Sequence, residues 1–208
     1  MKTYQVRSLS GQDFDNDAWS RADTLKDFIQ PWTDTAVQRT LFRALYDEDW
    51  LYLRYDVKDR EILVSTDRDH KLDVADSDRI EIFFRTDEDL ERYYCLELDP
   101  LGRILDYRAS FYRDFDYTWC WPQEELSVRA EVHEDGYLVE AKISLKSLAD
   151  LGILKDGNLN AGIFRGDCQR LGTGNGEAPS FNWITWVDPG TDTPDFHVKS
   201  AFGKLILG

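Results

Sequence analysis

YYCLELDPLGRILDYRAS, residues 93–110, contains the strongest fold signal in the chain. Two runs of alternating apolar and polar residues flank Asp-Pro-Leu-Gly at 99–102, a combination that supplies turn chemistry. Alternation over four to eight residues is typical of a β-strand, because successive side chains point to opposite faces of a sheet. This stretch therefore predicts an antiparallel β-hairpin.

The same pattern recurs along the chain. LSVRAEVHEDGYLVEAKISL, residues 126–145, is a second predicted hairpin with Glu-Asp-Gly at its tip. Other alternating runs predict strands from Trp50 (WLYLRYDVKD), from Asp78 (DRIEIFFRT), and at 38–46, 160–165 and 201–207. Helical patterns are short and fall at 144–152 and 24–29.

Many short strands with few helices are typical of a sandwich. We therefore expect an all-β fold, an antiparallel β-sandwich of immunoglobulin-like or jelly-roll-like type. It should have long loops and one or two short helices. The sequence has no internal repeat, linker or low-complexity tract, so residues 1–208 are predicted to form a single domain.

Three neighbouring strands are predicted to share a polar face. If Ile80, Leu96 and Leu105 point into the core with the residues that alternate with them, the opposite face carries Glu81, Tyr93, Glu97, Asp106 and Arg108. Such a patch is either an exposed ladder of cross-strand ion pairs or a surface that recognises hydroxyl groups.

Composition restricts the partners. The net charge of −15 argues against nucleic acid or an anionic membrane surface, both of which favour a positive protein surface. The chain contains no apolar run long enough to cross a membrane. Its first residues, MKTYQVRSLSGQDF, do not resemble a signal peptide, so we expect either a cytoplasmic protein or a chain whose leader is missing. The three cysteines lie far apart and predict neither a zinc site nor a disulfide framework.

An acidic stretch, STDRDHKLDVADSDR, is a weak candidate for a metal site. Asp67, Asp69 and Asp73 could supply oxygen ligands to a structural calcium ion, although the EF-hand pattern lacks its glycine. A solvated acidic loop is the simpler interpretation. No cofactor is predicted to be required.

The tryptophans are the best candidates for ligand contact. Four of the seven form the close pairs Trp119/Trp121 and Trp183/Trp186. The second pair opens NWITWVDPGTDTPDFH, residues 182–197, which does not alternate for long enough to predict an ordinary strand. Trp183 and Trp186 have opposite parity in an extended chain, so at most one faces the core. The other would cover a surface or offer its ring face to a sugar, unless it serves in packing alone.

Catalytic motifs are lacking. The sequence contains no GxSxG elbow, P-loop or HExxH motif. With 40 acidic residues, a pair of carboxylates at the spacing of a glycosidase would arise by chance. A small glycoside hydrolase using Glu81 and a second carboxylate is therefore an alternative with little support.

An ordered series of segments resembles the carbohydrate-binding module family 9-like domains. It comprises WSRAD from Trp19, LYDEDWLYLRYDVKD, DSDRIEIFF, YYCLELDPLG, YLVEAKISLKSL, AGIFR and WITWVDP…PDFH…FGKLIL. The resemblance covers nearly the whole chain. It implies a β-sandwich that binds sugars without catalysis, with chain ends held between aromatic rings and often with structural calcium. Any xylanase label among relatives would come from attached catalytic domains.

The resemblance also implies site residues. Glu81 matches the family's acidic residue in D-x-x-E-[IV]-F, Arg165 a late arginine, and Trp186, or else Trp183, the tryptophan wall before the proline turn. Asn182 is a further candidate by proximity, and Arg108 belongs to the polar face described above. The family's second tryptophan, just before the D-x-x-E strand, is replaced here by KLDVADSD; Trp121 or Trp119 could supply that wall.

These observations predict a module that binds a mono- or oligosaccharide, with xylan or cellulose as related polymers. A protein-interaction domain that has lost sugar binding is the other alternative. Its aromatic patch should be flat rather than concave.

Overall fold

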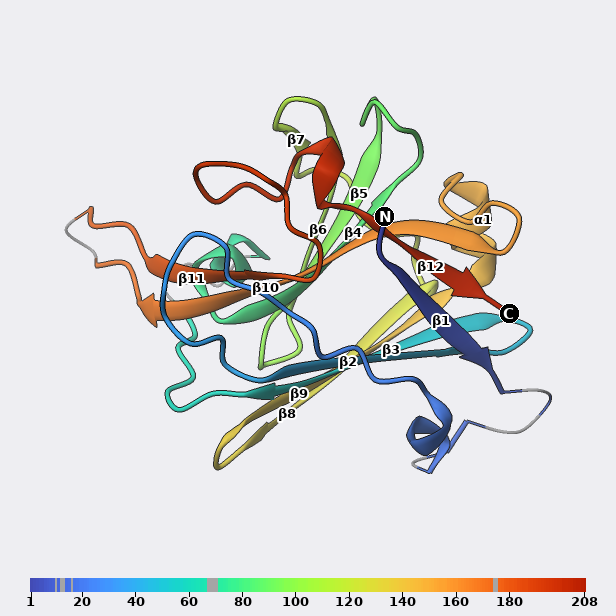
Figure 1. Cartoon of the computed structure of the whole chain (residues 1–208), viewed down its shortest axis with the longest axis horizontal. Coiled ribbons are helices and arrows are strands. Elements are labelled where there is room, and N and C mark those ends of the chain that lie inside the picture. The colour runs from blue at the N-terminus through green and yellow to red at the C-terminus, as the bar shows by residue number, and fades with distance from the viewer. Residues whose placement is uncertain (10, 12–13, 16, 67–70, 174–175) are drawn as a thin grey trace.

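The computed structural model describes residues 1–9, 11, 14–15, 17–66, 71–173 and 176–208. Its strands form two sheets packed face to face, which confirms the predicted β-sandwich (Figure 1). The first sheet has the order β7 (Asp114–Asp116), β6 (Ile104–Ser110), β5 (Tyr93–Leu98), β4 (Arg79–Arg85), β10 (Asn158–Arg170), β12 (Gly203–Leu207) and β1 (Thr3–Ser8). The second continues from β1 through β2 (Thr40–Tyr46), β3 (Trp50–Lys58), β9 (Gly136–Ser144) and β8 (Leu126–His133).

Strand β1 joins the two sheets. Residues 3–6 pair with β12, and Arg7 and Ser8 pair with β2, both in parallel. The expectation of a wholly antiparallel sandwich is therefore wrong at this junction. An additional strand, β11 (Ser180–Thr185), pairs with β10 and lies outside the main order. It occupies the first part of the 182–197 stretch, where alternation predicted no strand.

Helices are few and short. The described part of the chain contains one α-helix, α1 (Leu145–Asp150), and the 3-10 helices η1 (Ala18–Arg21), η2 (Lys71–Asp76) and η3 (Lys199–Ala201). The side chain of Ser144 accepts a hydrogen bond from the backbone N–H of Ser147 and so begins α1 as predicted. The helix predicted at 24–29 is absent. Leu25 and Ile29 instead form isolated β-bridges with Phe42 and Thr185.

The main core lies between the sheets. It contains the predicted inward residues of β3 and β4, such as Leu53, Tyr55, Ile80 and Ile82. A second apolar cluster covers the outer face of the first sheet, where Phe83, Tyr93 and Phe164 meet Phe196 and Phe202 from the chain after β11. Strands β4 and β5 are consequently buried on both faces.

The register of β6 differs from the prediction. Leu98 pairs with Ile104, so Asp106 pairs with Leu96 and Arg108 with Tyr94. Cross-strand partners point to the same face, and a shift of one residue moves every side chain of a strand to the other face. Leu105, Tyr107 and Ala109 therefore belong to the outer cluster, and Asp106 and Arg108 do not share a face with Glu81.

Candidate functional site

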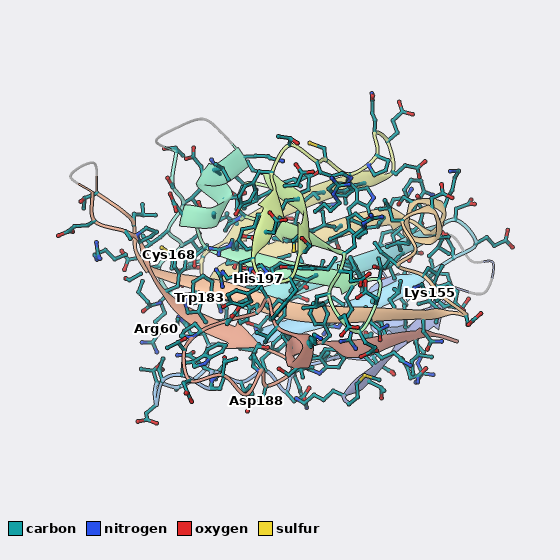
Figure 2. The ribbon with its side chains drawn as sticks, turned by 90° about the horizontal axis from the view of Figure 1, so that it is seen from above. Arg60, Lys155, Cys168, Trp183, Asp188 and His197 are labelled. Carbon is teal, nitrogen blue, oxygen red and sulfur yellow. The ribbon has the colours of Figure 1, made fainter. Side chains whose placement is uncertain are left out.

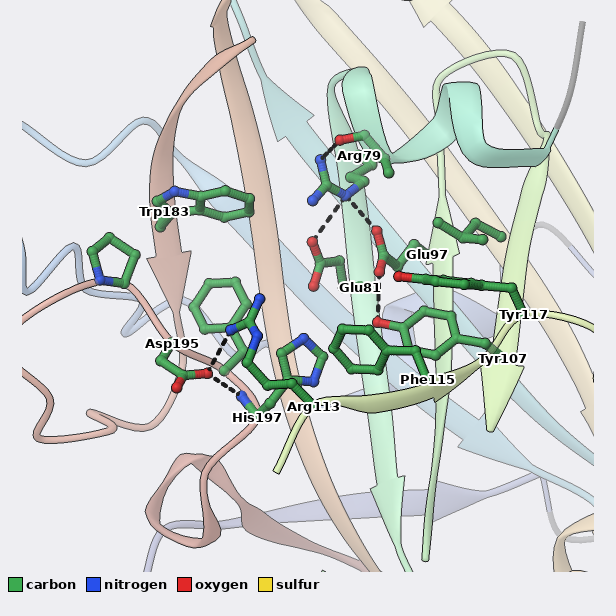
Figure 3. A pocket seen from close by; sticks show the side chains of 14 residues that line it. Arg79, Glu81, Glu97, Tyr107, Arg113, Phe115, Tyr117, Trp183, Asp195 and His197 are labelled. Carbon is green, nitrogen blue, oxygen red and sulfur yellow. Dashed lines mark hydrogen bonds and ion pairs between the residues drawn. The ribbon is translucent and has the colours of Figure 1, made fainter. Parts of the chain in front are cut away.

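A pocket of about 180 Å³ opens on the outer face of the first sheet. Strands β4, β5 and β6 supply its floor, and its walls come from β7 with its flanking turns, from Trp183 on β11 and from the segment after β11 (Figure 3). Figure 2 shows Trp183 and His197 close together near the middle of the molecule, with Lys155 far from them at one end. The lining residues are Ala75, Arg79, Glu81, Glu97, Leu105, Tyr107, Arg113, Phe115, Tyr117, Trp183, Pro194, Asp195, Phe196 and His197.

Two buried glutamates and one arginine form the floor. Glu81 and Glu97 are direct cross-strand partners on β4 and β5. Arg79 Nε donates to Glu97 Oε2 at 2.6 Å, and Arg79 Nη1 donates to the Ala75 and Ser77 carbonyls. The Tyr107 hydroxyl donates to Glu97 Oε1 at 2.8 Å. Both oxygens of Glu97 are thus occupied.

Glu81 is only partly satisfied. Its Oε1 lies 2.9 Å from Arg79 Nε as an ion pair, but it accepts no hydrogen bond from the residues that the structure describes. The residue is 2% exposed. Burial and the nearby Glu97 charge together raise the pKa of Glu81 to about 8, against the opposing effect of Arg79. A buried oxygen without a hydrogen-bond donor is costly, so a ligand hydroxyl that donates to it would gain binding energy.

Aromatic rings flank this floor. Trp183 lies on one side of the pocket and Tyr117 on the other (Figure 3). Trp183 is half-buried, packs edge-on against Phe196 at 5.6 Å between ring centroids, and has the Arg79 guanidinium 5.2 Å from its own centroid. Its cross-strand partner is Gly166, where an added Cβ would lie 3.4 Å from the Trp183 ring and 3.0 Å from Arg79. The glycine leaves room for both side chains.

The remaining wall combines charge with aromatic rings. Asp195 Oδ1 accepts from Arg113 Nη1 at 3.1 Å and from the His197 backbone N–H at 2.9 Å. His197 Nδ1 shares a hydrogen bond with the Tyr93 hydroxyl at 3.1 Å. Burial and the Arg113 charge together lower the pKa of His197 to about 3, so the ring is neutral at physiological pH.

The pocket thus has a buried polar floor and aromatic walls on a β-sandwich. The sequence of the chain also matches a protein-family model. The model, described as carbohydrate family 9 binding domain-like, matches residues 11–208. The chain belongs to this family. No curated protein matches the chain in sequence.

Solved structures share the fold of this family 9 domain. A protein from Bacteroides uniformis ATCC 8492, named for a proposed carbohydrate-binding role, superposes with a TM-score of 0.71 at 15% identity, covering 100% of this chain and 99% of that one. A family 9 module from Caldicellulosiruptor kristjanssonii in complex with glucose gives 0.59 at 16% identity, covering 100% and 96%. The same module type from that organism with cellotriose gives 0.60 at 17% identity, covering 99% and 93%.

Two predicted site tryptophans lie in the core of the family 9 domain. Trp186 is 2% exposed and packs so closely on Gly203 that an added Cβ would lie 2.5 Å from its ring. Trp121 is 6% exposed and donates from Nε1 to Ser147 Oγ. Neither lines the pocket. Trp183 and Trp186 therefore point to opposite faces of the sheet, as predicted. Trp183, not Trp186, lines the pocket.

Arg165 and Asn182 belong to a different buried cluster. Arg165 Nη2 lies 2.6 Å from Asp59 Oδ2 and 2.8 Å from Asp167 Oδ1, and Asn182 Nδ2 donates to Asp167 Oδ2. Arg165 points toward the second sheet because it alternates with Phe164, which is in the outer cluster. Arg165 therefore does not line the pocket, and its role at a sugar site stays a prediction.

The same cluster has three carboxylates close enough together to be considered as a calcium site. Asp59, Asp78 and Asp167 each place one oxygen within 4.8 Å of the other two. The Arg165 guanidinium already holds two of these carboxylates, and the oxygens of Asp78 accept the Leu63 and Cys168 backbone N–H groups. A second cation would lie against the guanidinium, so these residues do not fit a calcium ion.

Other predicted positions also lie outside the pocket. Asp67 and Asp69 fall outside the described residues, while Asp73 is fully buried with its Oδ2 3.9 Å from Arg103. Calcium at the acidic loop stays a prediction. Arg108 is paired with Asp116 at 2.8 Å on the other face of β6.

Sequence reasoning missed several pocket residues. Arg79 was detectable, because it precedes Glu81 by two residues and so shares its face. Tyr117, Arg113 and Asp195 come from irregular segments, where no periodicity indicates which way a side chain points.

Proposed function

We propose that this pocket binds one ring of a neutral saccharide without catalysis. Trp183 would contact the apolar face of the ring, and Glu81 would accept a hydrogen bond from a ring hydroxyl. The main support for this proposal is the buried Glu81 Oε1. It accepts no hydrogen bond from the described residues and lies beside an aromatic wall of the pocket.

The charge balance of the pocket favours a neutral ligand. Its two arginines, Arg79 and Arg113, are paired with Glu97 and Asp195, and the raised pKa of Glu81 favours its neutral form. No lining arginine is left to bind an acidic sugar. The net charge of −15 also repels acidic polysaccharides.

Tyr117 is proposed as the second wall in place of the tryptophan missing before β4. It is 38% exposed and lines the pocket across from Trp183 (Figure 3). The glucose and cellotriose bound by the Caldicellulosiruptor kristjanssonii modules support a glucose-type ring as the first ligand to try.

The glycosidase alternative receives less support from the geometry. Inverting and retaining glycosidases place two carboxyl groups on either side of the scissile bond. Glu81 and Glu97 instead lie side by side on one arginine. Glu81 has the raised pKa of a general acid, but its neighbour is held by Arg79 and Tyr107. The pocket is also concave, which disfavours a flat protein-docking patch.

Calorimetric titration with glucose, xylose, cellobiose and xylobiose tests the proposal. We expect saturable binding to at least one sugar, with Kd roughly in the micromolar to millimolar range, and no release of product. Trp183→Ala should abolish the signal. The matched control is Trp50→Ala, because Trp50 is partly buried on the second sheet, far from the pocket. Equal binding by wild type and Trp183→Ala would refute the assignment.

A further inference from the structure

Strand β8 forms an open edge of the second sheet. It pairs with β9 on one side, and no strand of the described residues pairs with its other side (Figure 1). Its inward side chains are partly buried as far as Ala130, and its outward ones are exposed; Val132, near the end of the strand, is 52% exposed. A long exposed edge strand is a template for pairing with another chain.

The ladder with β9 identifies the backbone groups that face this edge. His133 and Gly136 close a two-residue turn and so form a hydrogen-bonded pair, and at the other end Glu125 accepts from the Ser144 N–H at 2.9 Å. Hydrogen bonds to β9 therefore use the odd-numbered residues. Among the described residues, no group bonds to the N–H and C=O groups that point away from β9. These groups belong to Leu126, Val128, Ala130 and Val132.

The side chains of β8 are arranged symmetrically about Ala130. Arg129 and Glu131 flank it on the outer face, and Val128 and Val132 flank it on the inner face. If two copies pair antiparallel with Ala130 opposite Ala130, Arg129 of each copy faces Glu131 of the other, and Val128 faces Val132. Moving the two-fold axis by one residue places either Arg129 or Glu131 opposite its own copy, and like charges directly opposite are destabilising.

A turn of the first sheet supplies further apolar surface beside this edge. A Cβ added at Gly102 would lie 3.6 Å from the Ala130 nitrogen and 3.7 Å from its Cβ, and the glycine leaves this space without a side chain. Leu101, next to Gly102, is 57% exposed. Together with Val132 it offers apolar surface that a second copy would cover.

We propose that β8 is a homodimer interface, in which two copies pair antiparallel about Ala130 and join their second sheets edge to edge. A single self-complementary strand is suited to such a two-fold contact, because each copy presents the same surface to the other. The contact is smaller than a standard interface, so we expect a Kd of roughly 10–100 µM and a monomer at submicromolar concentration.

The net charge of −15 opposes this association at low ionic strength. At about 0.15 M salt, however, interactions between exposed charges are largely screened beyond about 8 Å. The side chains that meet directly at the interface then decide the outcome. In this register they form two oppositely charged pairs, one on each side of the axis.

Sedimentation equilibrium tests the proposal between about 1 and 500 µM protein at about 0.15 M salt. The average mass of wild type should rise from 24.3 kDa toward twice that value. Arg129→Glu and Glu131→Arg each place like charges opposite one another, so either variant alone should dimerise roughly 10-fold more weakly.

Mixing the two variants tests the register. A chain with Arg129→Glu carries acidic side chains at both positions, and a chain with Glu131→Arg carries basic ones, so an equimolar mixture should form a heterodimer. The double variant should dimerise like wild type. Arg170→Glu, which changes the charge of an exposed pair with Glu177 away from β8, is the matched control and should leave dimerisation unchanged. Circular dichroism checks that each variant is folded.

Each result decides a separate part of the proposal. A wild type that stays at 24.3 kDa up to the highest concentration would overturn the dimer. Dimerisation that Arg129→Glu weakens no more than Arg170→Glu does would overturn the assignment to β8. A mixture of the two single variants that dimerises no better than either alone would overturn the pairing about Ala130.

Discussion

Trp183 and Trp186 have opposite structural roles although they are three residues apart. Trp183 is half-buried at the pocket, and Trp186 fills the main core against Gly203. Odd separation in an extended segment places them on opposite faces of the first sheet. Substitution at the two positions should therefore affect different properties.

At the residue scale, Trp186→Ala should lower the free energy of unfolding by about 3–5 kcal/mol, because it leaves a cavity in a packed core. Trp183→Ala should cost less, since its ring is half-exposed, yet it should remove sugar binding. Urea denaturation of both variants measures the difference. Equal stability losses would show that Trp183 is as much a core residue as Trp186.

At the element scale, β10 connects the two sheets through a buried charge. Arg165 is fully buried on this strand and holds Asp59, which follows β3, as well as Asp167. Breaking a buried ion pair by removing one partner leaves unpaired charge in the interior, a change that costs several kcal/mol.

Arg165→Ala should therefore lower the free energy of unfolding by about 3–5 kcal/mol. Arg129→Ala, which removes an exposed pair with Glu131 on β8, should cost less than about 1 kcal/mol. Chemical denaturation of the two variants gives the comparison. If Arg165→Ala lowered the free energy of unfolding as little as Arg129→Ala, the Arg165 ion pairs with Asp59 and Asp167 would not contribute measurably to stability.

The elements also show what the sequence can predict. The faces of β3 and β4 were predicted correctly, and β4 placed Glu81 on the face that carries the pocket. In β6, Leu105 and Tyr107 are as buried as a core residue, so their hydrophobicity does not reveal which of two apolar clusters they join. The register follows from the connection at 99–103, whose geometry the residue types do not determine.

The candidate site was predicted less completely than the fold. The alternation of β4 and β5 predicts that Glu81 and Glu97 share a face. Trp183 was one of the two tryptophans that the sequence offered as the aromatic wall. Tyr117 and Asp195 reach the pocket only because irregular segments cover the outer face of the first sheet. Tertiary contacts, not local patterns, fix such segments.

At the scale of the whole molecule, buried carboxyl groups link stability to pH. Burial raises the pKa of Asp78 to about 7 and that of Glu81 to about 8, above their usual values of 3.8 and 4.5. At pH values between the usual and the raised pKa of each group, the native state holds a proton that the unfolded state has released. Stability therefore decreases as pH rises through this range. His197, with its pKa lowered to about 3, acts in the opposite direction, but only below about pH 6.5.

Stability should therefore fall by roughly 1–3 kcal/mol between pH 6.5 and 8.5. Glu81→Gln should reduce this slope, and the exposed control Glu61→Gln should not. Urea denaturation across this pH range measures both. A flat profile for wild type would contradict the raised pKa values of Glu81 and Asp78.

No helix among the described residues is long and apolar enough to span a membrane. The sandwich instead has two outer faces of different character. The first sheet carries the pocket under its covering segments, whereas the second presents charged residues such as Arg54 and Glu140. The central claim is that ligand binds on the first sheet, at Trp183.

Nuclear magnetic resonance tests this claim most directly. Each of the seven tryptophans gives one indole N–H signal in a ¹⁵N-labelled sample, and Trp183→Phe and Trp186→Phe assign the two that matter. On titration with the sugar that binds in calorimetry, the Trp183 signal should shift most, and the Trp186 and Trp50 signals should stay in place. A dominant shift at Trp186, or at Trp50 on the second sheet, would contradict the account.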